Sequence, residues 1–460
     1  MTALPERLPS PARSLIDRFL PQGAAILSIL SFAYLVMGQV RNRMLATTFG
    51  VGPELDAYNA AFRIPEVALD ILVASGLTAP FIPIFSRLRG DDERAANEFA
   101  QSVLTVAVIA MTAAAIGMFL FAPLITAEVG RGFDPATRAA YLDLFRINCL
   151  AQVLFAASIC LGEVLVANRR FVFYALAPLL YQSGIVLGTL LLAGSVGIFA
   201  PAWGAVGGAV AHLAIRLTGT LRTSFRARPR LHVRAPAFRE FIRLMLPRML
   251  SYPIEPVMLT FFTALAINLG SANVSALNFA SDYQVVPATL IGIPFSLAVF
   301  PALSAAFADG DRPRFRSIVV RNVVTIGALT LVAAVIIWIA APLIITVLLR
   351  GGAFDERDAA LTAGVLAAFA LSVPFDSLSY PLSRALYATH NTVLQVIASF
   401  AGLGIVVVAA LGLTPALGVV GIPFAYAAGM AVKVALLTVF LVPRVRRIGS
   451  DAHEPVSRDA

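Results

Sequence analysis

Charged residues are scarce in this chain of 460 residues. Only 13% of the residues are Asp, Glu, Lys or Arg, about half the share of a typical soluble domain, whereas 59% are hydrophobic. Apolar runs of roughly 20 residues, the length that a helix needs to cross a bilayer, recur from end to end. These runs exclude a soluble globular protein, and they are too long for the alternating strands of an outer-membrane barrel. The composition predicts an all-α integral membrane protein.

Cysteine and histidine are also rare, with two and four residues. Cys149 and Cys160 fall in one predicted span, about three turns apart, which is too far for a disulfide. No histidine pairs with Cys, Asp or Glu at metal-ligand spacing, and neither a Walker sequence nor a nucleophile elbow is present. We therefore expect no enzyme, no catalytic residues, no metal and no cofactor. The net charge of +9 is attributed to membrane topology and headgroup contact, so no nucleic-acid partner is expected.

The apolar pattern predicts about twelve transmembrane helices. Lys and Arg concentrate in alternate loops, which favours an even number of spans with both termini in the cytoplasm. The second and eighth spans are long and contain prolines, so a tilted or broken helix is expected in each. The predicted limits are 22–48, 55–86, 98–125, 140–167, 171–193, 203–221, 240–269, 273–307, 317–349, 358–388, 391–413 and 416–442.

Short sequences recur at a nearly constant offset. "APLIT" at 122–126 returns as "APLIIT" at 341–346, and "RGFD" at 131–134 returns as "RGGAFD" at 350–355. "LVANRR" at 165–170 lies opposite "LYATHN" at 386–391. We infer two six-helix lobes, 1–230 and 231–460, related by an internal parallel repeat, with an arginine-rich linker near 222–239. In transporters with this plan, a central site lies between halves that rock against each other.

Four ionisable residues interrupt the second span. Placed on a helix at about 100° per residue, Asp56, Arg63, Glu66 and Asp70 lie within roughly a quarter of the circumference. A charge that faces acyl chains is costly, so such a stripe faces either a hydrated cavity or a partner helix. A buried structural network is the alternative explanation. The cavity is favoured because Asp56 and the nearby Arg41 extend the polar surface beyond what pairing needs.

The second half carries matching charges in its first two spans. Arg248 and Glu255 are seven residues apart, on one helix face and among prolines, and Asp282 follows in the eighth span. Arginine suits phosphate because its planar guanidinium binds bidentately, and the carboxylates could couple to H⁺ or Na⁺ or could hold the arginines in place. Five other charges lie inside spans, and the two nearest to span ends, Arg216 and Lys433, are expected to snorkel to the headgroups. The remaining three are Arg146, Glu163 and Asp376.

Glycine patterns add little about function. "GAVGGAV" at 204–210 places small residues at close spacing, which in a membrane span is typical of helix packing. "GLGIVV" at 402–407 lacks the third glycine of a dinucleotide fingerprint, so no nucleotide site is predicted there.

Two segments carry a resemblance to a known family. "FGVGPELDAYNAAFRIPEVALDILVASGLTAPFIPIF" at 49–85 resembles the MurJ/MviN family, the lipid II flippases of peptidoglycan synthesis. "VVPATLIGIPFSLAVFPALSAAFADGD" at 285–311 is similar to the corresponding segment of the second half. The resemblance implies the fold of the multidrug/oligosaccharidyl-lipid/polysaccharide exporter superfamily, with two bundles, a central cavity and alternating access. It also implies a multi-pass protein of the bacterial inner membrane.

The sequence departs from the family pattern at several basic positions. Leu35 and Leu69 stand where the family has arginine, and an expected arginine of the eighth span falls at or next to Asp282, whereas Arg248 is an additional basic residue. The leading hypothesis is a flippase for a polyprenyl-diphosphate-linked sugar, with membrane lipids and H⁺ or Na⁺ as further partners. A cation-coupled multidrug exporter of the same superfamily is the alternative. The substrate-binding residues expected are Arg41, Asp56, Arg63, Glu66, Asp70, Arg248, Glu255 and Asp282.

Overall fold

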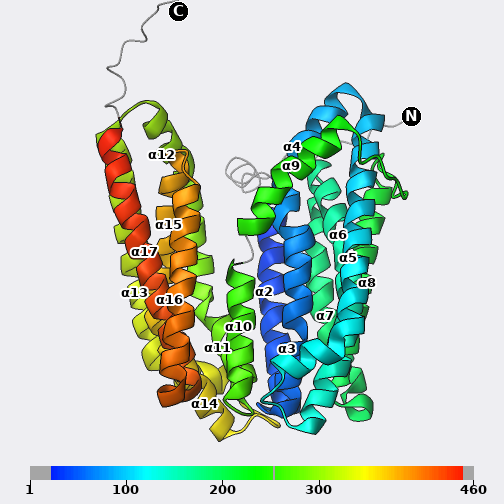
Figure 1. Cartoon of the computed structure of the whole chain (residues 1–460), viewed down its shortest axis with the longest axis vertical. Coiled ribbons are helices and arrows are strands. Elements are labelled where there is room, and N and C mark those ends of the chain that lie inside the picture. Colours follow the sequence, from blue (N-terminus) through cyan, green and yellow to red (C-terminus); the bar gives the residue numbers. More distant parts are fainter. Residues whose placement is uncertain (1–21, 252–253, 449–460) are drawn as a thin grey trace, which may run out of the picture. The chain divides into compact units, whose positions relative to one another are not determined.

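A computed structural model describes residues 22–251 and 254–448 (Figure 1). Within these ranges the regular structure is helical, apart from one isolated bridge between Gly351 and Phe354. The elements of the first half are α2 (Gln22–Phe49), α3 (Pro53–Leu69), η1 (Asp70–Ala74), α4 (Ser75–Asp91), α5 (Glu93–Val129), α6 (Pro135–Ala167), α7 (Phe171–Val196) and α8 (Phe199–Leu221). Those that follow are α9 (Pro236–Ser251), α10 (Ile254–Asn268), α11 (Asn273–Gln284), η2 (Ala288–Gly292), α12 (Ile293–Ala308), α13 (Arg312–Leu349), α14 (Glu356–Phe369), η3 (Ala370–Ser372), α15 (Val373–Ala388), α16 (Val393–Leu417), η4 (Gly418–Val420) and α17 (Gly421–Arg447).

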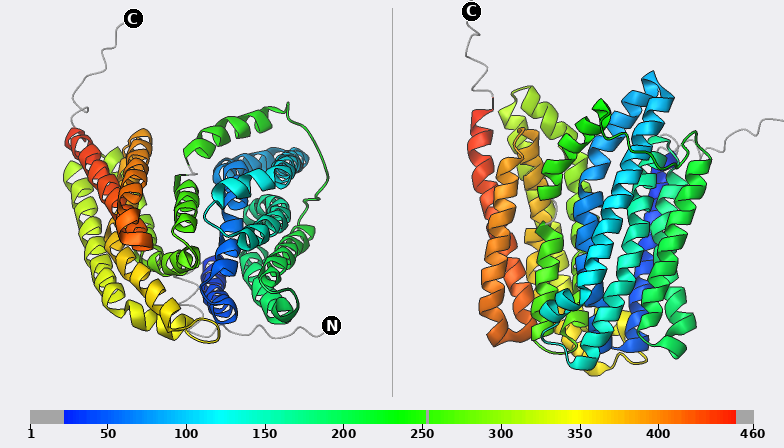
Figure 2. Two further views of the ribbon diagram at one scale, coloured as in Figure 1. Left: turned by 60° about the horizontal axis from the view of Figure 1, so that its bottom comes forward. Right: turned by 45° about the vertical axis from the view of Figure 1, so that its right-hand side comes forward.

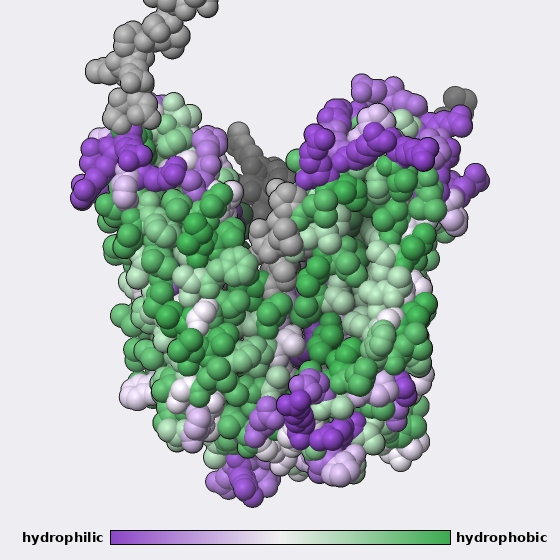
Figure 3. All heavy atoms as spheres, viewed as in Figure 1, coloured by the Kyte–Doolittle hydropathy of each residue, from purple (hydrophilic) through white to green (hydrophobic). Residues whose placement is uncertain are grey.

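The all-α prediction is confirmed, and each predicted span lies largely within helices where the chain is described. Seven helical segments of the described chain are long and apolar enough to cross a membrane by length and composition, and the last of them, Val393–Arg447, contains both α16 and α17. Hydrophobic residues cover the length of the helices, while hydrophilic residues gather at their ends (Figure 3). This distribution is what a bilayer requires of a multi-pass protein.

The two long, proline-containing spans are broken, as predicted. A five-residue π-helix, η1, separates α3 from α4, and a second, η2, separates α11 from α12. A proline lies close to each break: Pro65 is inside α3, and Pro287 directly precedes η2. A proline removes an i→i−4 hydrogen bond, and a π-turn absorbs the mismatch that results.

The internal repeat extends to the backbone conformation. Arg169 and His390, 221 residues apart, both adopt φ of 56°, although neither is glycine. Gly197 (φ 57°) and Gly418 (φ 59°), again 221 residues apart, end the equivalent helices α7 and α16. A left-handed residue at a helix end is usually set by local sequence, so its recurrence at one offset supports the duplication that the short motifs indicated.

The described part of the chain forms two compact units. Unit 1 comprises 22–45, 61–126 and 139–251, and unit 2 comprises 46–60, 127–138 and 254–448. The core of unit 1 includes a ladder of aromatic rings in which Phe81 lies 5.6 Å from Phe85 and 5.5 Å from Phe99, between ring centroids. One core cluster of unit 2 is mainly aliphatic and surrounds Phe315. The lobe boundary expected between 230 and 231 stays a prediction.

Glycines bring α7 and α8 into close contact in unit 1. A Cβ atom built on Gly204 would lie 2.6 Å from the carbonyl oxygen of Gly184 and 3.0 Å from the Cα atom of Gly188. The equivalent pair α16 and α17 uses the same device, since a Cβ on Gly429 would lie 2.7 Å from the carbonyl oxygen of Gly402. Figure 2 shows both pairs running side by side. The packing interpretation of "GAVGGAV" is confirmed.

Substituting one of these glycines tests the α7–α8 contact. Gly204→Val is expected to lower the melting temperature and the yield of monodisperse protein, because the added side chain forces two backbones apart and overpacking costs about 1–3 kcal/mol or more. Gly207→Val is the matched control, since a Cβ there meets no atom within 4 Å. Equal melting temperatures for the two variants would contradict the packing described here.

Candidate functional site

Asp56 lies at the start of the charged stripe and is fully buried, with 0% of its surface exposed. Its Oδ1 atom accepts hydrogen bonds from the backbone N–H of Ser275 at 2.7 Å and from the Ser275 hydroxyl at 2.5 Å. Ser275 lies in the first turn of α11, where backbone N–H groups have no partner within the helix. Asp56 therefore caps α11 from another helix, and the partial positive charge of that helix end stabilises the carboxylate.

Further contacts join residues 46–60 to the second half of the chain, all within unit 2. The backbone N–H of Val51 donates to Asp358 Oδ2 at 3.0 Å, and that of Ala353 donates to the carbonyl of Thr47 at 2.8 Å. Asn59 Nδ2 donates to the Ser275 hydroxyl at 3.2 Å. We call the residues 46–60 together with their contacts to α11 and 353–358 the latch. Asp56 and Ser275 are its fully buried polar residues.

The rest of the stripe differs from Asp56 in its surroundings. Arg63 and Glu66 lie on α3 and Asp70 begins η1, and all three are half-buried in unit 1. Their partial exposure agrees with side chains that border a polar space. Asp56 belongs to unit 2, because the boundary between the units falls between residues 60 and 61. The charged stripe therefore extends over both units. Substrate contact by these four residues stays a prediction.

The other expected site residues are distributed over both units. In unit 1, Arg41 is half-buried and donates to Asn42 Oδ1 from Nε at 3.1 Å and from Nη2 at 2.6 Å. In unit 2, Glu255 is exposed at the start of α10 and Asp282 is half-buried in α11. The backbone of Arg248 belongs to α9, but its side chain lies outside the described part of the structure.

A second polar cluster lies in unit 2, around Asp376 on α15. Its carboxylate is buried and accepts a hydrogen bond from Gln284 Nε2 at 3.3 Å and another from the Tyr426 hydroxyl. The ammonium group of Lys433 on α17 interacts electrostatically with both Asp376 and Glu255. Four helices thus contribute polar groups to this Asp376 cluster: α10, α11, α15 and α17. A cluster that combines two carboxylates with one ammonium can bind or exchange a small cation.

Lys433 is the only lysine in the chain, and every other one of the 35 basic residues is arginine. Its side chain is half-buried, and its ammonium group interacts electrostatically with Asp376 and Glu255, which speaks against the expected snorkelling to the headgroups. Sequence reasoning noted Asp376 and Lys433 as intramembrane charges but did not pair them. The single lysine was the available signal, since an ammonium, unlike a guanidinium, is a compact point charge.

Arg216 on α8 also corrects an expectation. Its side chain is buried rather than snorkelling, with 5% of its surface exposed. The Nη1 atom donates to the carbonyl of Ser158 at 2.7 Å, and the guanidinium lies 4.9 Å from the centre of the Tyr174 ring. The buried Glu163 interacts electrostatically with it. These contacts stabilise the charge inside the bundle, so we regard Arg216 as a structural residue of unit 1.

A search for metal ligands in the described ranges finds no group of three or more His, Cys, Asp or Glu side chains that could hold an ion.

Known proteins resemble this chain over most of its length. Residues 45–453 match the family described as lipid II flippase MurJ. A probable lipid II flippase MurJ of Rhizobium meliloti is 27% identical over 448 residues, which cover 94% of this chain and 81% of the relative. One from Borreliella burgdorferi is 24% identical over 77% of this chain and 70% of the relative. The lipid II flippase MurJ of Burkholderia cenocepacia is 22% identical over 80% and 73%.

Solved structures share the fold. A lipid II flippase MurJ in an inward closed conformation matches with a TM-score of 0.79 and 21% identity, over 93% of this chain and 90% of that one. An inward-facing multidrug resistance transporter of the MATE family matches with a TM-score of 0.71 and 15% identity, over 92% and 96%. The likeness to both is a likeness of fold, whereas the sequence match spans most of the chain and is specific. The chain belongs to the lipid II flippase MurJ family.

Proposed function

We propose that this protein is a flippase that moves a polyprenyl-diphosphate-linked sugar, similar to lipid II, across the bacterial cytoplasmic membrane by alternating access. The family match over residues 45–453 is the observation that carries the proposal. The protein acts as a transporter and not as an enzyme. It spans the membrane many times, with both termini in the cytoplasm, as the distribution of arginine over the loops favours.

The charged side chains of unit 1 supply the chemistry that a diphosphate needs. Arg63 is half-buried on α3, and Arg41 is half-buried on α2. A guanidinium in a partly dehydrated place binds phosphate oxygens bidentately, and such charge-assisted hydrogen bonds are about twice as strong as neutral ones. Glu66 and Asp70, on the same stripe, balance the charge when no substrate is present. In the second half of the chain, we propose that the substrate also contacts Arg248, Glu255 and Asp282.

The Asp376 cluster is proposed as the site of ion coupling. Asp376 is buried and hydrogen-bonded, whereas Glu255 is exposed, so the cluster connects a sheltered carboxylate with an accessible one. Lys433 already supplies one positive charge to two carboxylates. With both carboxylates ionised, one negative charge would remain, which a single H⁺ or Na⁺ would neutralise.

Complementation tests the substrate and the role of Arg63. In a strain depleted of its own lipid II flippase, expression of this chain should restore translocation of labelled lipid II. Arg63→Ala is expected to reduce the rate about 10- to 100-fold, because a hydrogen bond to a charged group contributes about 1.5–3 kcal/mol. Arg63→Lys should lie between, since it keeps the charge but loses the bidentate geometry.

Arg312→Gln is the control for Arg63, because Arg312 is exposed at the start of α13. Failure of the wild-type chain to restore translocation, with folded protein present in the membrane, would exclude lipid II as substrate. Wild-type rates in Arg63→Ala would instead remove Arg63 from the binding site and leave the substrate unaffected.

A cation-coupled multidrug exporter is the second candidate. The observation that favours it is the replacement of expected basic residues by Leu35 and Leu69, which leaves fewer arginines for a diphosphate. Efflux of cationic dyes driven by Na⁺ or H⁺, without translocation of labelled lipid II, would establish this function in place of the first.

A further inference from the structure

Helix α9 has two different faces. Phe238, Phe241 and Met245, spaced for one face of a helix, are buried in the core of unit 1. Met245 packs against Gly76, where the absence of a side chain on α4 lets the helices approach. The neighbouring face carries Arg239, Ile242, Arg243 and Leu246, also at helical spacing, and Ile242 partly packs against the same core. This face is both basic and apolar, which is typical of a helix that lies at a membrane interface.

A groove lies on the basic face of α9. It has a volume of about 620 Å³ and is lined by Val233, Phe238, Arg239, Ile242, Arg243 and Leu246. Its size falls within the roughly 300–1,000 Å³ of typical small-ligand sites. Four of its residues are apolar and the other two are arginines. We call it the α9 groove.

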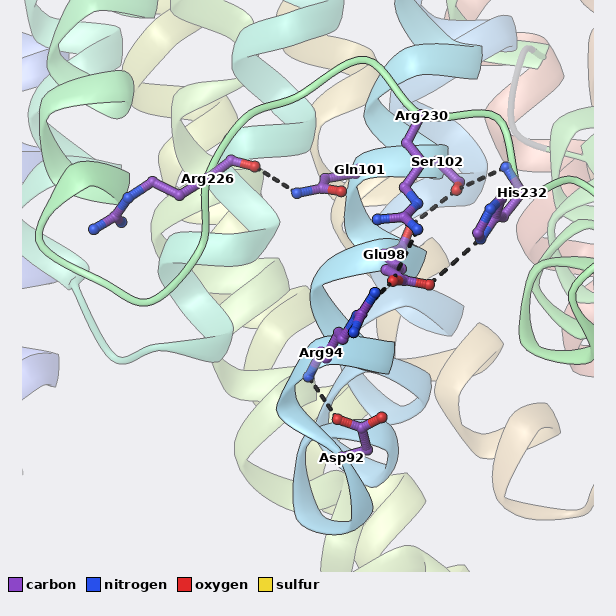
Figure 4. A network of polar contacts seen from close by, with 8 residues as sticks. All are labelled: Asp92, Arg94, Glu98, Gln101, Ser102, Arg226, Arg230 and His232. Carbon is purple, nitrogen blue, oxygen red and sulfur yellow. Dashed lines mark hydrogen bonds and ion pairs between the residues drawn. The ribbon is translucent and has the colours of Figure 1, made fainter.

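Val233 lines the groove and belongs to the linker between α8 and α9, which hydrogen bonds hold against α5 (Figure 4). Gln101 Nε2 on α5 donates to the carbonyl of Arg226 at 2.7 Å. The backbone N–H of Arg230 donates to the Thr105 hydroxyl at 3.0 Å, and that of His232 donates to the Ser102 hydroxyl at 3.2 Å. The chain next to Val233 is thus held against α5, and the groove exists before any ligand arrives.

The acidic side chains near the groove are already engaged. Glu240 forms a bidentate pair with Arg87 at 3.2 and 2.5 Å, and this pair holds the pKa of the Glu240 carboxyl below its usual value. Glu98 lies 3.1 Å from Arg94 Nε and 2.9 Å from Arg230 Nη2, as Figure 4 shows. Within the described ranges, no acidic side chain pairs with Arg239 or Arg243, and both are exposed.

We propose that the α9 groove binds one anionic phospholipid of the membrane, with its phosphate on Arg239 and Arg243 and an acyl chain along the apolar wall. Two guanidinium groups one helical turn apart can share a phosphate. The apolar residues of the groove lie beside the two arginines, where they can contact an acyl chain. A free phosphate would leave that surface in water. The inference is independent of which lipid the protein transports.

The site is tested by measuring the affinity of the purified full-length protein for phosphatidylglycerol with native mass spectrometry. Arg239→Gln/Arg243→Gln should weaken the tightest phosphatidylglycerol site about 25-fold, because each arginine near an anionic headgroup contributes about fivefold. The matched control is Arg312→Gln/Arg316→Gln, which removes an exposed arginine pair of equal spacing on α13. That control should change the affinity less than threefold, and phosphatidylcholine should bind weakly to all forms.

A second variant keeps the test independent of the arginines. Ile242→Trp fills the groove and should weaken phosphatidylglycerol while both arginines remain. If both double variants lost the same affinity for phosphatidylglycerol, the effect would be one of general surface charge, and the proposal would be overturned. It would also be overturned if Ile242→Trp bound normally, if inorganic phosphate displaced the lipid, or if a polyprenyl diphosphate displaced it at equal concentration, since the groove would then belong to the transported lipid.

Discussion

Asp56→Ala is expected to destabilise the protein by about 3 kcal/mol, because truncation leaves the Ser275 N–H and hydroxyl without their acceptor in a fully buried place. Each unsatisfied buried group costs about 1–3 kcal/mol, and the cap of α11 is lost as well. The measurement is the melting temperature of the purified protein in detergent, together with the amount of protein in the membrane. Ser275→Ala should cost less, since its backbone N–H can still donate to Asp56.

Glu54→Ala is the matched control for this effect. Glu54 is an exposed acid on the same helix, two residues before Asp56, so its removal should change the melting temperature little. Equal melting temperatures for Asp56→Ala and Glu54→Ala would contradict the capping role. The latch would then contribute nothing measurable to the described conformation.

Asp376→Leu is expected to abolish transport and to destabilise the protein by up to about 3 kcal/mol, because the ammonium group of Lys433 loses a buried carboxylate with which it interacts electrostatically. Lys433→Met should act in the same direction, since it leaves Asp376 without its ammonium partner. Combining the two substitutions removes both charges. The double variant should regain most of the lost stability, as apolar replacements of buried pairs often do, but it should not regain transport.

A double-mutant cycle on the melting temperatures and on lipid II translocation gives the coupling between the two residues. Glu356→Gln is the control, because the Glu356–Arg350 pair, 3.5 Å apart, is exposed and such pairs contribute about 0–1 kcal/mol. A double variant no more stable than the weaker single variant would show that the two groups do not compensate each other. Full transport in the double variant would remove the Asp376 cluster from the mechanism.

The positions of the helices follow from the sequence because bilayer crossing imposes a long apolar run on each one. The break in the second span was also predictable, since Pro65 cannot donate the hydrogen bond that a regular helix needs. The repeat was visible in three short motifs, and the left-handed residues Arg169 and His390 fall at the same spacing. These features are local, so local sequence is enough to predict them.

The partners of the intramembrane charges were not predictable in this way. Asp56 contacts Ser275, which is 219 residues away, and no helical periodicity records such a contact. Arg216 lies near the end of its span, and the sequence permits both snorkelling and burial. Burial is favoured by the backbone carbonyl of Ser158 and the ring of Tyr174, which lie on neighbouring helices and contact the guanidinium inside the bundle.

Asp56 and Ser275 occupy nearly equivalent positions of the two repeats, since the offset of 219 residues matches that of the "APLIT" motifs. In an ancestral homodimer of the half-length chain, one residue at this position would meet its own copy across a twofold axis. Two aspartates there would repel each other, and two serines would lack the strong acceptor. In a single chain the two positions are free to differ, so that one is an acid and the other a donor. An asymmetric bond of this kind is available only to a single chain.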